Sequence, residues 1–348
     1  MTAAATLRAE AAKRILIKDG AYGTLIQQER LQSADYCAGL DLLKDQRGNN
    51  DLLNLTQPAI VRGICESFAE AGAEILATNT FNANAISQAD FDAEQLAPRM
   101  NRVSAEIVRE VADRYSAKEG KPRWVAGALG PTNKTLSLSP NVNDPAFREV
   151  DFDQVKGVYR EQIDALVEGG IDFVLVETIF DTLNAKAAIM AALEAEQALG
   201  RGLPLMISMT LTDLSGRNLS GHTVEGFWAS IRHARPITVG LNCSFGAAQL
   251  RPHLAALAAA ADTLVMAYPN AGLPNELGEY DEAAEETAAQ VRDWVDSGLV
   301  NIVGGCCGTT PLHIAAIAGA ARDCTPRVVP AARLGTLLAG LEPMLIAA

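Results

Sequence analysis

The sequence is poor in positive charge, and this limits the partners that it can bind. Its 348 residues include 29 lysines and arginines against 42 aspartates and glutamates, which gives a formal net charge of -13 at pH 7. The long-range field of such a chain repels nucleic acid and anionic membranes. Neither is therefore expected as a partner, and small molecules or another protein are favoured.

Long hydrophobic runs and cysteines are also scarce. No segment approaches the roughly 18 consecutive apolar residues of a membrane span, and the first residues lack the apolar core of a signal peptide. The six cysteines show no disulfide-scaffold spacing, which favours a reducing compartment. The glycine-rich stretch 304–308 has no phosphate-loop lysine, and no dinucleotide-binding motif occurs. The sequence therefore predicts a soluble, cytoplasmic protein that does not bind nucleotides.

Short apolar runs alternate with helical patterns along the whole chain, as in an α/β fold. Eight runs are predicted strands: 15–18, 74–77, 124–128, 173–176, 205–209, 239–241, 264–267 and 301–303. Eight strands with intervening helices predict a (β/α)8 TIM barrel, whereas an open, doubly wound sheet is the alternative. Long polar connections, above all 130–151, predict enlarged loops at the C-terminal face of the barrel.

The predicted barrel covers residues 15–327. Residues 1–14 are expected to form an N-terminal helical extension. Residues 328–348 are punctuated by proline and glycine and are expected to form a C-terminal tail or linker.

Polar and sulfur-bearing residues follow the predicted strands. Because the chemistry of this fold lies at the C-terminal ends of its strands, these residues are the candidates for a functional site. They are Asp19, Asn79, Glu177, Asn242, Cys243, Asn270, Cys306 and Cys307.

Three of these candidates are cysteines from two strand ends. Thiolates are soft ligands, and three of them suit tetrahedral zinc with the fourth position left for water or substrate. They could instead be small buried apolar side chains, and Cys306 and Cys307 could form a vicinal disulfide. No histidine is assigned to the metal, and His313, early in the last predicted helix, is expected to be solvated.

Two carboxylates, Asp19 and Glu177, also end predicted strands. They could act as an acid and a base, or they could bind a cationic group of a substrate. A third possibility is that they only cap turns, and Asp19 before Gly20 suits that role.

Eight motifs together resemble the homocysteine-binding module of cobalamin-dependent methionine synthase. They are D-G-A-Y-G-T (19–24), G-N-N-D-L-L-N-L-T-Q-P (48–58), T-N-T-F (78–81), G-P-T-N-K-T (130–135), V-E-T-I-F-D-T (176–182), G-L-N-C (240–243), Y-P-N-A-G-L-P (268–274) and G-G-C-C-G-T-T-P (304–311). The resemblance extends from residue 15 to about residue 343. It implies a single module, or one subunit of a split enzyme, whose folate and cobalamin modules lie elsewhere.

The resemblance also implies an activity in methionine biosynthesis. Zn²⁺ held by the catalytic cysteines Cys243, Cys306 and Cys307 would ionise the thiol of homocysteine, which has an ordinary pKa of about 8.5. The sulfur would then accept the methyl group of methylcobalamin, bound by a cobalamin-carrying methionine synthase module or subunit.

The substrate residues follow from the same resemblance. Asp19 and Glu177 would hold the ammonium of homocysteine, and backbone groups of Gly20 and Ala21 would hold its carboxylate. Asn242, next to the first cysteine, is also predicted to bind substrate.

Two alternatives remain at this point. The chain could be a free-standing homocysteine S-methyltransferase that uses S-methylmethionine or a related small methyl donor. It could also be a non-catalytic protein that binds zinc or thiols.

Overall fold

The computed structural model describes residues 2–332 and 334–347, and it contains the predicted barrel. Eight parallel strands follow the order β1-β8-β7-β6-β5-β4-β3-β2. An isolated parallel bridge between Lys18 and Ile75 joins the two outer strands of this order, so the sheet closes on itself. The strands are β1 (Leu16–Ile17), β2 (Ile75–Ala77), β3 (Trp124–Leu129), β4 (Phe173–Ile179), β5 (Leu205–Met209), β6 (Thr238–Asn242), β7 (Leu264–Tyr268) and β8 (Ile302–Val303). The prediction of a (β/α)8 barrel is confirmed.

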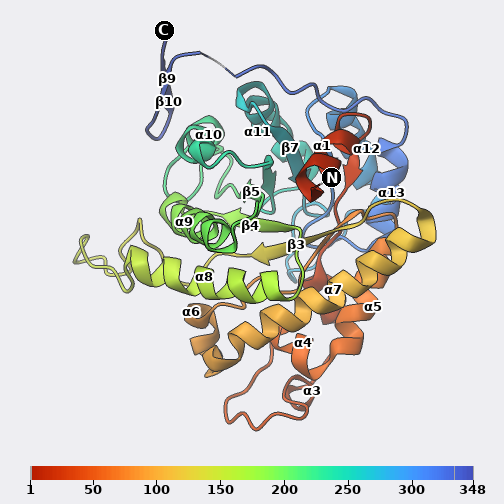
Figure 1. The fold of residues 1–348 in the computed structure, drawn as a ribbon, viewed down its shortest axis with the longest axis vertical. Helices are drawn as coiled ribbons and strands as arrows, with labels where there is room; N and C mark the ends of the chain where they lie inside the picture. Colours follow the sequence, from red (N-terminus) through yellow and green to blue (C-terminus); the bar gives the residue numbers. More distant parts are fainter. Residues whose placement is uncertain (1, 333, 348) are drawn as a thin grey trace.

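Helices surround the sheet (Figure 1). None of the helices in the described part of the chain has the length and apolar character needed to span a membrane. The helices are α1 (Ala3–Ala11), α2 (Tyr22–Gln28), α3 (Ser33–Tyr36), α4 (Leu53–Thr56), α5 (Pro58–Glu70), α6 (Ala85–Gln88), α7 (Ala97–Glu119), α8 (Phe152–Glu168), α9 (Thr182–Leu199), α10 (Val224–Ile231), α11 (Ala247–Ala260), α12 (Ala284–Asp296) and α13 (Pro311–Ala321).

Local sequence explains where the longer helices begin and end. Asp151 caps α8, since its side chain accepts the Gln154 N–H and the Gln154 side chain accepts the Asp151 N–H in return. Pro58 lies at the first position of α5, where a missing N–H costs nothing. Gly120 ends α7 in the left-handed conformation that glycine adopts without a steric penalty.

Two apolar clusters fill the space on the two faces of the sheet. Side chains alternate along a strand, so Trp124 and Ala126 of β3 belong to one cluster and Val125 belongs to the other. The larger cluster packs the outer face of the sheet against the helices. The smaller one fills the inside of the barrel, with Phe173 and Met266 among its members.

Helix α1 packs over the N-terminal end of the barrel interior. Leu7 and Ala11 of this helix are fully buried, and both belong to the interior cluster together with Leu16 and Trp124. Within the predicted N-terminal extension, Ala3–Ala11 form a helix, and this helix contributes two side chains to the core.

A two-stranded hairpin, β9 (Thr336–Ala339) and β10 (Pro343–Ile346), lies in the predicted tail and projects beside α10 (Figure 1). The carbonyl oxygen of Leu341 at its turn accepts the Thr223 N–H at 2.9 Å. A Cβ at Gly226 would lie 2.3 Å from the same oxygen, so this contact requires glycine. Residues 1, 333 and 348 of the two predicted terminal segments lie outside the described residues.

Arg327, at the C-terminal end of the predicted barrel, binds backbone groups on the N-terminal side of the sheet. Its guanidinium donates to the backbone carbonyls of Ala258, Ala261 and Thr263, and only 6% of the residue is exposed. Burial lowers its pKa to about 10, so the group stays charged at neutral pH.

Replacing Arg327 by alanine is expected to lower the free energy of unfolding by about 3 to 5 kcal/mol, because three buried carbonyls lose their donors. Thermal and urea unfolding followed by circular dichroism measure this. Arg322→Ala, at an exposed position five residues earlier, is the control and should change stability by less than about 0.5 kcal/mol. Equal stability of the two variants would contradict the assignment.

Candidate functional site

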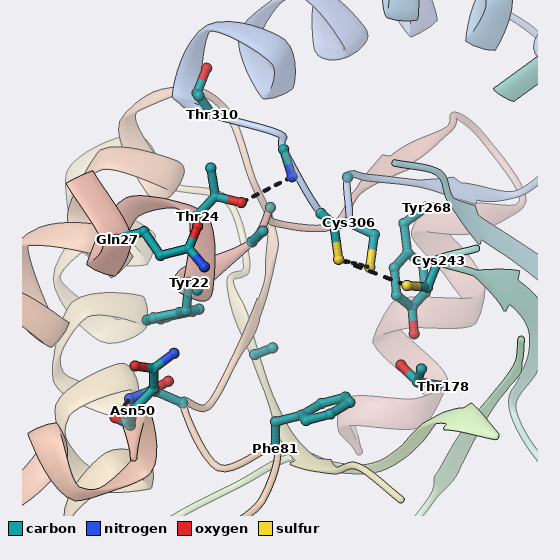
Figure 2. Close-up of a pocket in the computed structure, with 18 of the residues that line it drawn as sticks. Tyr22, Thr24, Gln27, Asn50, Phe81, Thr178, Cys243, Tyr268, Cys306 and Thr310 are labelled. Atoms are coloured by element: carbon teal, nitrogen blue, oxygen red, sulfur yellow. Dashed lines mark hydrogen bonds between the residues drawn. The ribbon is translucent and has the colours of Figure 1, made fainter. Parts of the chain in front are cut away.

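A cavity of about 820 Å³ opens at the C-terminal face of the barrel. The residues at its wall come from the ends of β1, β2, β4, β6, β7 and β8 and from the loops that follow them. Figure 2 shows Cys243 and Cys306 on one side of this space, Tyr22, Gln27 and Asn50 on the opposite side, and Phe81 between the two.

Three thiols converge at the wall of the cavity. The Cys243 Sγ lies 3.8 Å from the Cys307 Sγ, which in turn lies 4.0 Å from the Cys306 Sγ. All three sulfurs lie within 4.8 Å of one another, and none of these cysteines is in a disulfide. The structure therefore brings together the three cysteines that the sequence singled out, and it does not contain the vicinal disulfide.

Backbone contacts fix the two loops that carry these thiols. The Cys306 N–H donates to the Pro269 carbonyl at 2.8 Å, and the Ala271 N–H donates to the Cys307 carbonyl at 2.9 Å. Thr24 at the start of α2 accepts the Gly308 N–H at 2.9 Å (Figure 2). The cysteine loop after β8 is thus held from both sides.

The donor set fits a tetrahedral metal ion with thiolate ligands. Two Zn–S bonds of about 2.3 Å at the tetrahedral angle separate their sulfurs by about 3.8 Å, which agrees with the observed distances of 3.8 and 4.0 Å. Asn270, whose backbone adjoins the same loops, is 2% exposed, and its Oδ1 has no hydrogen-bond partner in the described part of the chain.

Hydrogen bonds among the three cysteines shift their pKa values in opposite directions. Hydrogen bonds from Cys243 and Cys306 lower the pKa of Cys307 to about 3. Hydrogen bonds with Cys243 and Cys307, with burial, raise the pKa of Cys306 well above that of an ordinary thiol. These contacts favour the thiolate form at Cys307, and the thiolate is the form in which cysteine binds a metal.

Asn242 lies behind the cysteines and outside the described lining of the cavity. It is fully buried, and its Oδ1 accepts from Ser208 at 2.7 Å and from the Thr178 N–H at 3.1 Å. Its Nδ2 donates to the Thr178 Oγ1 at 2.8 Å and faces the Cys306 Sγ at 3.8 Å. Because its polar atoms are engaged with other residues, Asn242 is placed to position its neighbours, and substrate binding by Asn242 stays a prediction.

Three residues at the site have a left-handed backbone. Thr178 has φ 56°, and Cys243 and Ser244 both have φ 64°. This conformation is strained for residues other than glycine, above all for a β-branched threonine. The paired hydrogen bonds with Asn242 hold Thr178 there and so fix where the chain turns after Glu177.

Glu177 lies at the cavity wall and is 9% exposed. Its Oε2 accepts the Tyr268 hydroxyl at 3.0 Å. Burial raises the pKa of its carboxyl group, and the nearby Lys18 opposes that rise. Glu177 thus faces the cavity, and its contact with the ammonium of the substrate stays a prediction.

Asp19 is fully buried and is absent from the described lining of the cavity. Its Oδ1 accepts the Lys18 ammonium at 2.7 Å, and its Oδ2 accepts the Ala77 N–H at 2.7 Å. Contact between Asp19 and the substrate ammonium therefore stays a prediction. Gly20 and Ala21 do line the cavity, and no acceptor in the described structure takes their N–H groups.

The loop after β7 and the predicted enlarged loop 130–151 differ in their position relative to the cavity. Glu279 and Tyr280 of the loop after β7 line the cavity, whereas no residue of 130–151 does so in the described lining. The loop 130–151 instead packs along α9, where Asp181 accepts from the backbone and side chain of Ser137.

The expectation that His313 is solvated was wrong. His313 is 9% exposed and lines the cavity. One ring nitrogen contacts Thr310 at 3.0 Å and the other contacts the Glu282 carbonyl at 2.9 Å. Its place in the first turn of α13 directs it toward the loop after β7, which shields it from water.

Five polar residues point into the barrel at its C-terminal end, and sequence analysis named only two of them as candidates. The signal was the alternation of the strands, because each of these residues lies two positions after another inward-facing residue. They are Lys18 after Leu16, Glu177 after Leu175, Ser208 after Met206, Asn242 after Gly240 and Tyr268 after Met266. Only Glu177 and Asn242 were named from the sequence.

Comparison with known proteins agrees with this geometry. The family model described as homocysteine S-methyltransferase matches residues 16–321. The fold is similar to that of the homocysteine methyltransferase MmuM from Escherichia coli. The oxidized form superposes with a TM-score of 0.70 at 21% identity over 90% of this chain and 99% of that one. The metallated form gives a TM-score of 0.67 at 21% identity over 88% of this chain and 96% of that one.

The family match spans the barrel from its first strand to its last helix and includes all three cysteines at the cavity. The chain therefore belongs to the homocysteine S-methyltransferase family.

Proposed function

We propose that this protein transfers a methyl group from methylcobalamin to homocysteine and forms methionine, with Zn²⁺ held by Cys243, Cys306 and Cys307. The observation that carries the proposal is the convergence of three free thiols, spaced as in a tetrahedral thiolate site, at the wall of a large cavity. When bound, zinc would supply a Lewis acid that ionises the homocysteine thiol at neutral pH.

The chain's own residues orient the substrate. Glu177 presents an oxygen that no described residue takes, and it is the partner for the substrate ammonium. The free N–H groups of Gly20 and Ala21 are donors to the substrate carboxylate. Anchored at these points, homocysteine extends its thiol along the wall toward the cysteines.

The methyl donor is proposed to arrive on a cobalamin-carrying partner. A corrin ring is too wide to enter a barrel, so it has to dock over the mouth of the cavity. Loops at this face carry exposed apolar side chains, among them Leu43, Val142, Leu214 and Leu277. Of these, Leu277 adjoins the lining residues Gly278, Glu279 and Tyr280, and it offers an apolar contact to another protein at the mouth.

A second candidate donor is a small sulfonium compound such as S-methylmethionine. The cavity volume of about 820 Å³ favours it, because that volume exceeds what homocysteine alone needs. A chamber that holds both substrates could exclude water during the transfer.

Cys306→Ser is expected to abolish zinc retention and methionine formation and to leave the barrel folded, because a core of this size does not depend on a metal. Cys243→Ser and Cys307→Ser should behave alike. Metal analysis, far-UV circular dichroism and an activity assay measure these effects. Cys37→Ser, which changes a thiol outside the cavity lining, is the control, and a zinc-replete, active Cys306→Ser protein would refute the metal assignment.

Glu177→Gln is expected to weaken homocysteine binding by about 1 to 3 kcal/mol, the scale of a lost charged hydrogen bond, and to retain zinc. Calorimetric titration of the zinc-loaded protein measures the change. Glu279→Gln alters an exposed carboxylate at the same mouth and should have little effect. Unchanged affinity in Glu177→Gln would remove Glu177 from the substrate site.

Assays with three methyl donors distinguish the candidate activities. Methionine should form with free methylcobalamin at high concentration and much faster with a cobalamin-carrying protein, whereas S-methylmethionine should give little. Parallel assays with equal homocysteine measure the rates. Efficient use of S-methylmethionine without any response to methylcobalamin would reverse the choice, and stoichiometric zinc without methionine from any donor would favour a non-catalytic protein.

A further inference from the structure

Lys18 places a buried ammonium at the floor of the cavity. The residue is 4% exposed, lies two positions after Leu16 on the inner face of β1, and belongs to the cavity lining. Its neighbour Gly304 allows this placement, because a Cβ there would lie 2.8 Å from the Lys18 Cβ. A buried lysine is rare unless it is paired, so its surroundings have to account for it.

The Lys18 ammonium has three N–H groups, and only one of them donates a hydrogen bond in the described structure. Its acceptor is the Asp19 Oδ1 at 2.7 Å. The ammonium also lies 4.5 Å from the centre of the Tyr268 ring, a cation–π contact that takes no hydrogen bond. Burial alone would lower the pKa of Lys18, but Asp19 and Glu177 more than offset this and raise it. Lys18 is therefore a cation whose remaining N–H groups can donate hydrogen bonds to a ligand.

Lys18 is the only buried lysine or arginine among the described residues that line the cavity, since Arg30 lies at its exposed edge. The other charged or acidic groups of the wall are Asp51, Glu177, Glu279 and the cysteines. A carboxylate that enters this cavity is repelled by these acidic groups and attracted at Lys18.

Glu177 complements Lys18 across Tyr268. The Tyr268 hydroxyl bonds the Glu177 Oε2, which leaves Oε1 without a hydrogen-bond partner in the described structure, while its ring supports the Lys18 ammonium. One tyrosine therefore joins a cation with free donors and an anion with a free acceptor. An amino-acid zwitterion satisfies both.

We propose that Lys18 binds the α-carboxylate of the amino-acid substrate while Glu177 binds its ammonium, and that Asp19 is a positioning residue that orients Lys18. The proposal rests on the proposed function, which supplies homocysteine as the substrate. In this proposal Lys18 binds the substrate carboxylate together with the N–H groups of Gly20 and Ala21. The proposal also gives Asp19 a role that agrees with its complete burial.

The test compares two thiols that differ only in the carboxylate, L-homocysteine and 3-mercaptopropylamine, by calorimetric titration of the zinc-loaded protein without methyl donor. Lys18→Met should weaken homocysteine binding by about 10- to 100-fold, the scale of a lost charged hydrogen bond. Binding of 3-mercaptopropylamine should change by less than about threefold, because it has no carboxylate to lose. Asp19→Asn should also weaken the binding of homocysteine more than that of 3-mercaptopropylamine, but by a smaller factor than Lys18→Met.

Lys44→Met, at an exposed position, is the matched control and should change neither affinity. If Lys18→Met fails to fold because the buried Asp19 loses its ionic partner, the double variant Lys18→Met/Asp19→Asn removes both charges and answers the same question. Equal loss of affinity for the two thiols, or no loss for homocysteine, would overturn the proposal. Wild-type protein that binds neither thiol would instead refute the proposed function.

Discussion

The closure of eight parallel strands into a barrel is the constraint on which the site depends. Closure forces every second side chain inward, where it meets its counterparts from the other strands. The inward positions are apolar through the middle of the barrel, as at Leu16, Leu175 and Met266. Two residues after these positions lie Lys18, Glu177 and Tyr268. The Tyr268 hydroxyl bonds Glu177, and its ring contacts the Lys18 ammonium. Polar chemistry and apolar packing thus occupy one continuous interior.

The strained backbone at the mouth is held by the interior beneath it. Thr178 and Cys243 keep a left-handed conformation, at a cost of about 1 to 3 kcal/mol each. The fully buried Asn242 bonds Thr178 twice and directly precedes Cys243, so a single side chain ties these two turns together. A rigid support of this kind keeps the thiol wall and the carboxylate of Glu177 in a fixed relation before any ligand binds.

Sequence alone predicted the barrel and the three cysteines, because eight apolar runs and thiols at strand ends are visible in one dimension. It could not give the burial of Asp19 or the engagement of Asn242, since both depend on atoms from distant strands, such as the Lys18 and Ala77 partners of Asp19. His313 was misjudged because shielding by a separate loop leaves no periodic signal. Lys18 was overlooked although the alternation marks it as inward.

Helix α1 covers the N-terminal end of the interior with Leu7 and Ala11. The same cluster, with Phe173 and Met266, fills the interior below the cavity, so ligands reach the cavity only from the C-terminal face of the barrel. Two molecules that share such a passage cannot bind in random order when one lies beneath the other. The deeper molecule would have to bind first and its product leave last, so the packed end of the barrel, α1 included, would impose an order of binding on a two-substrate reaction at this site.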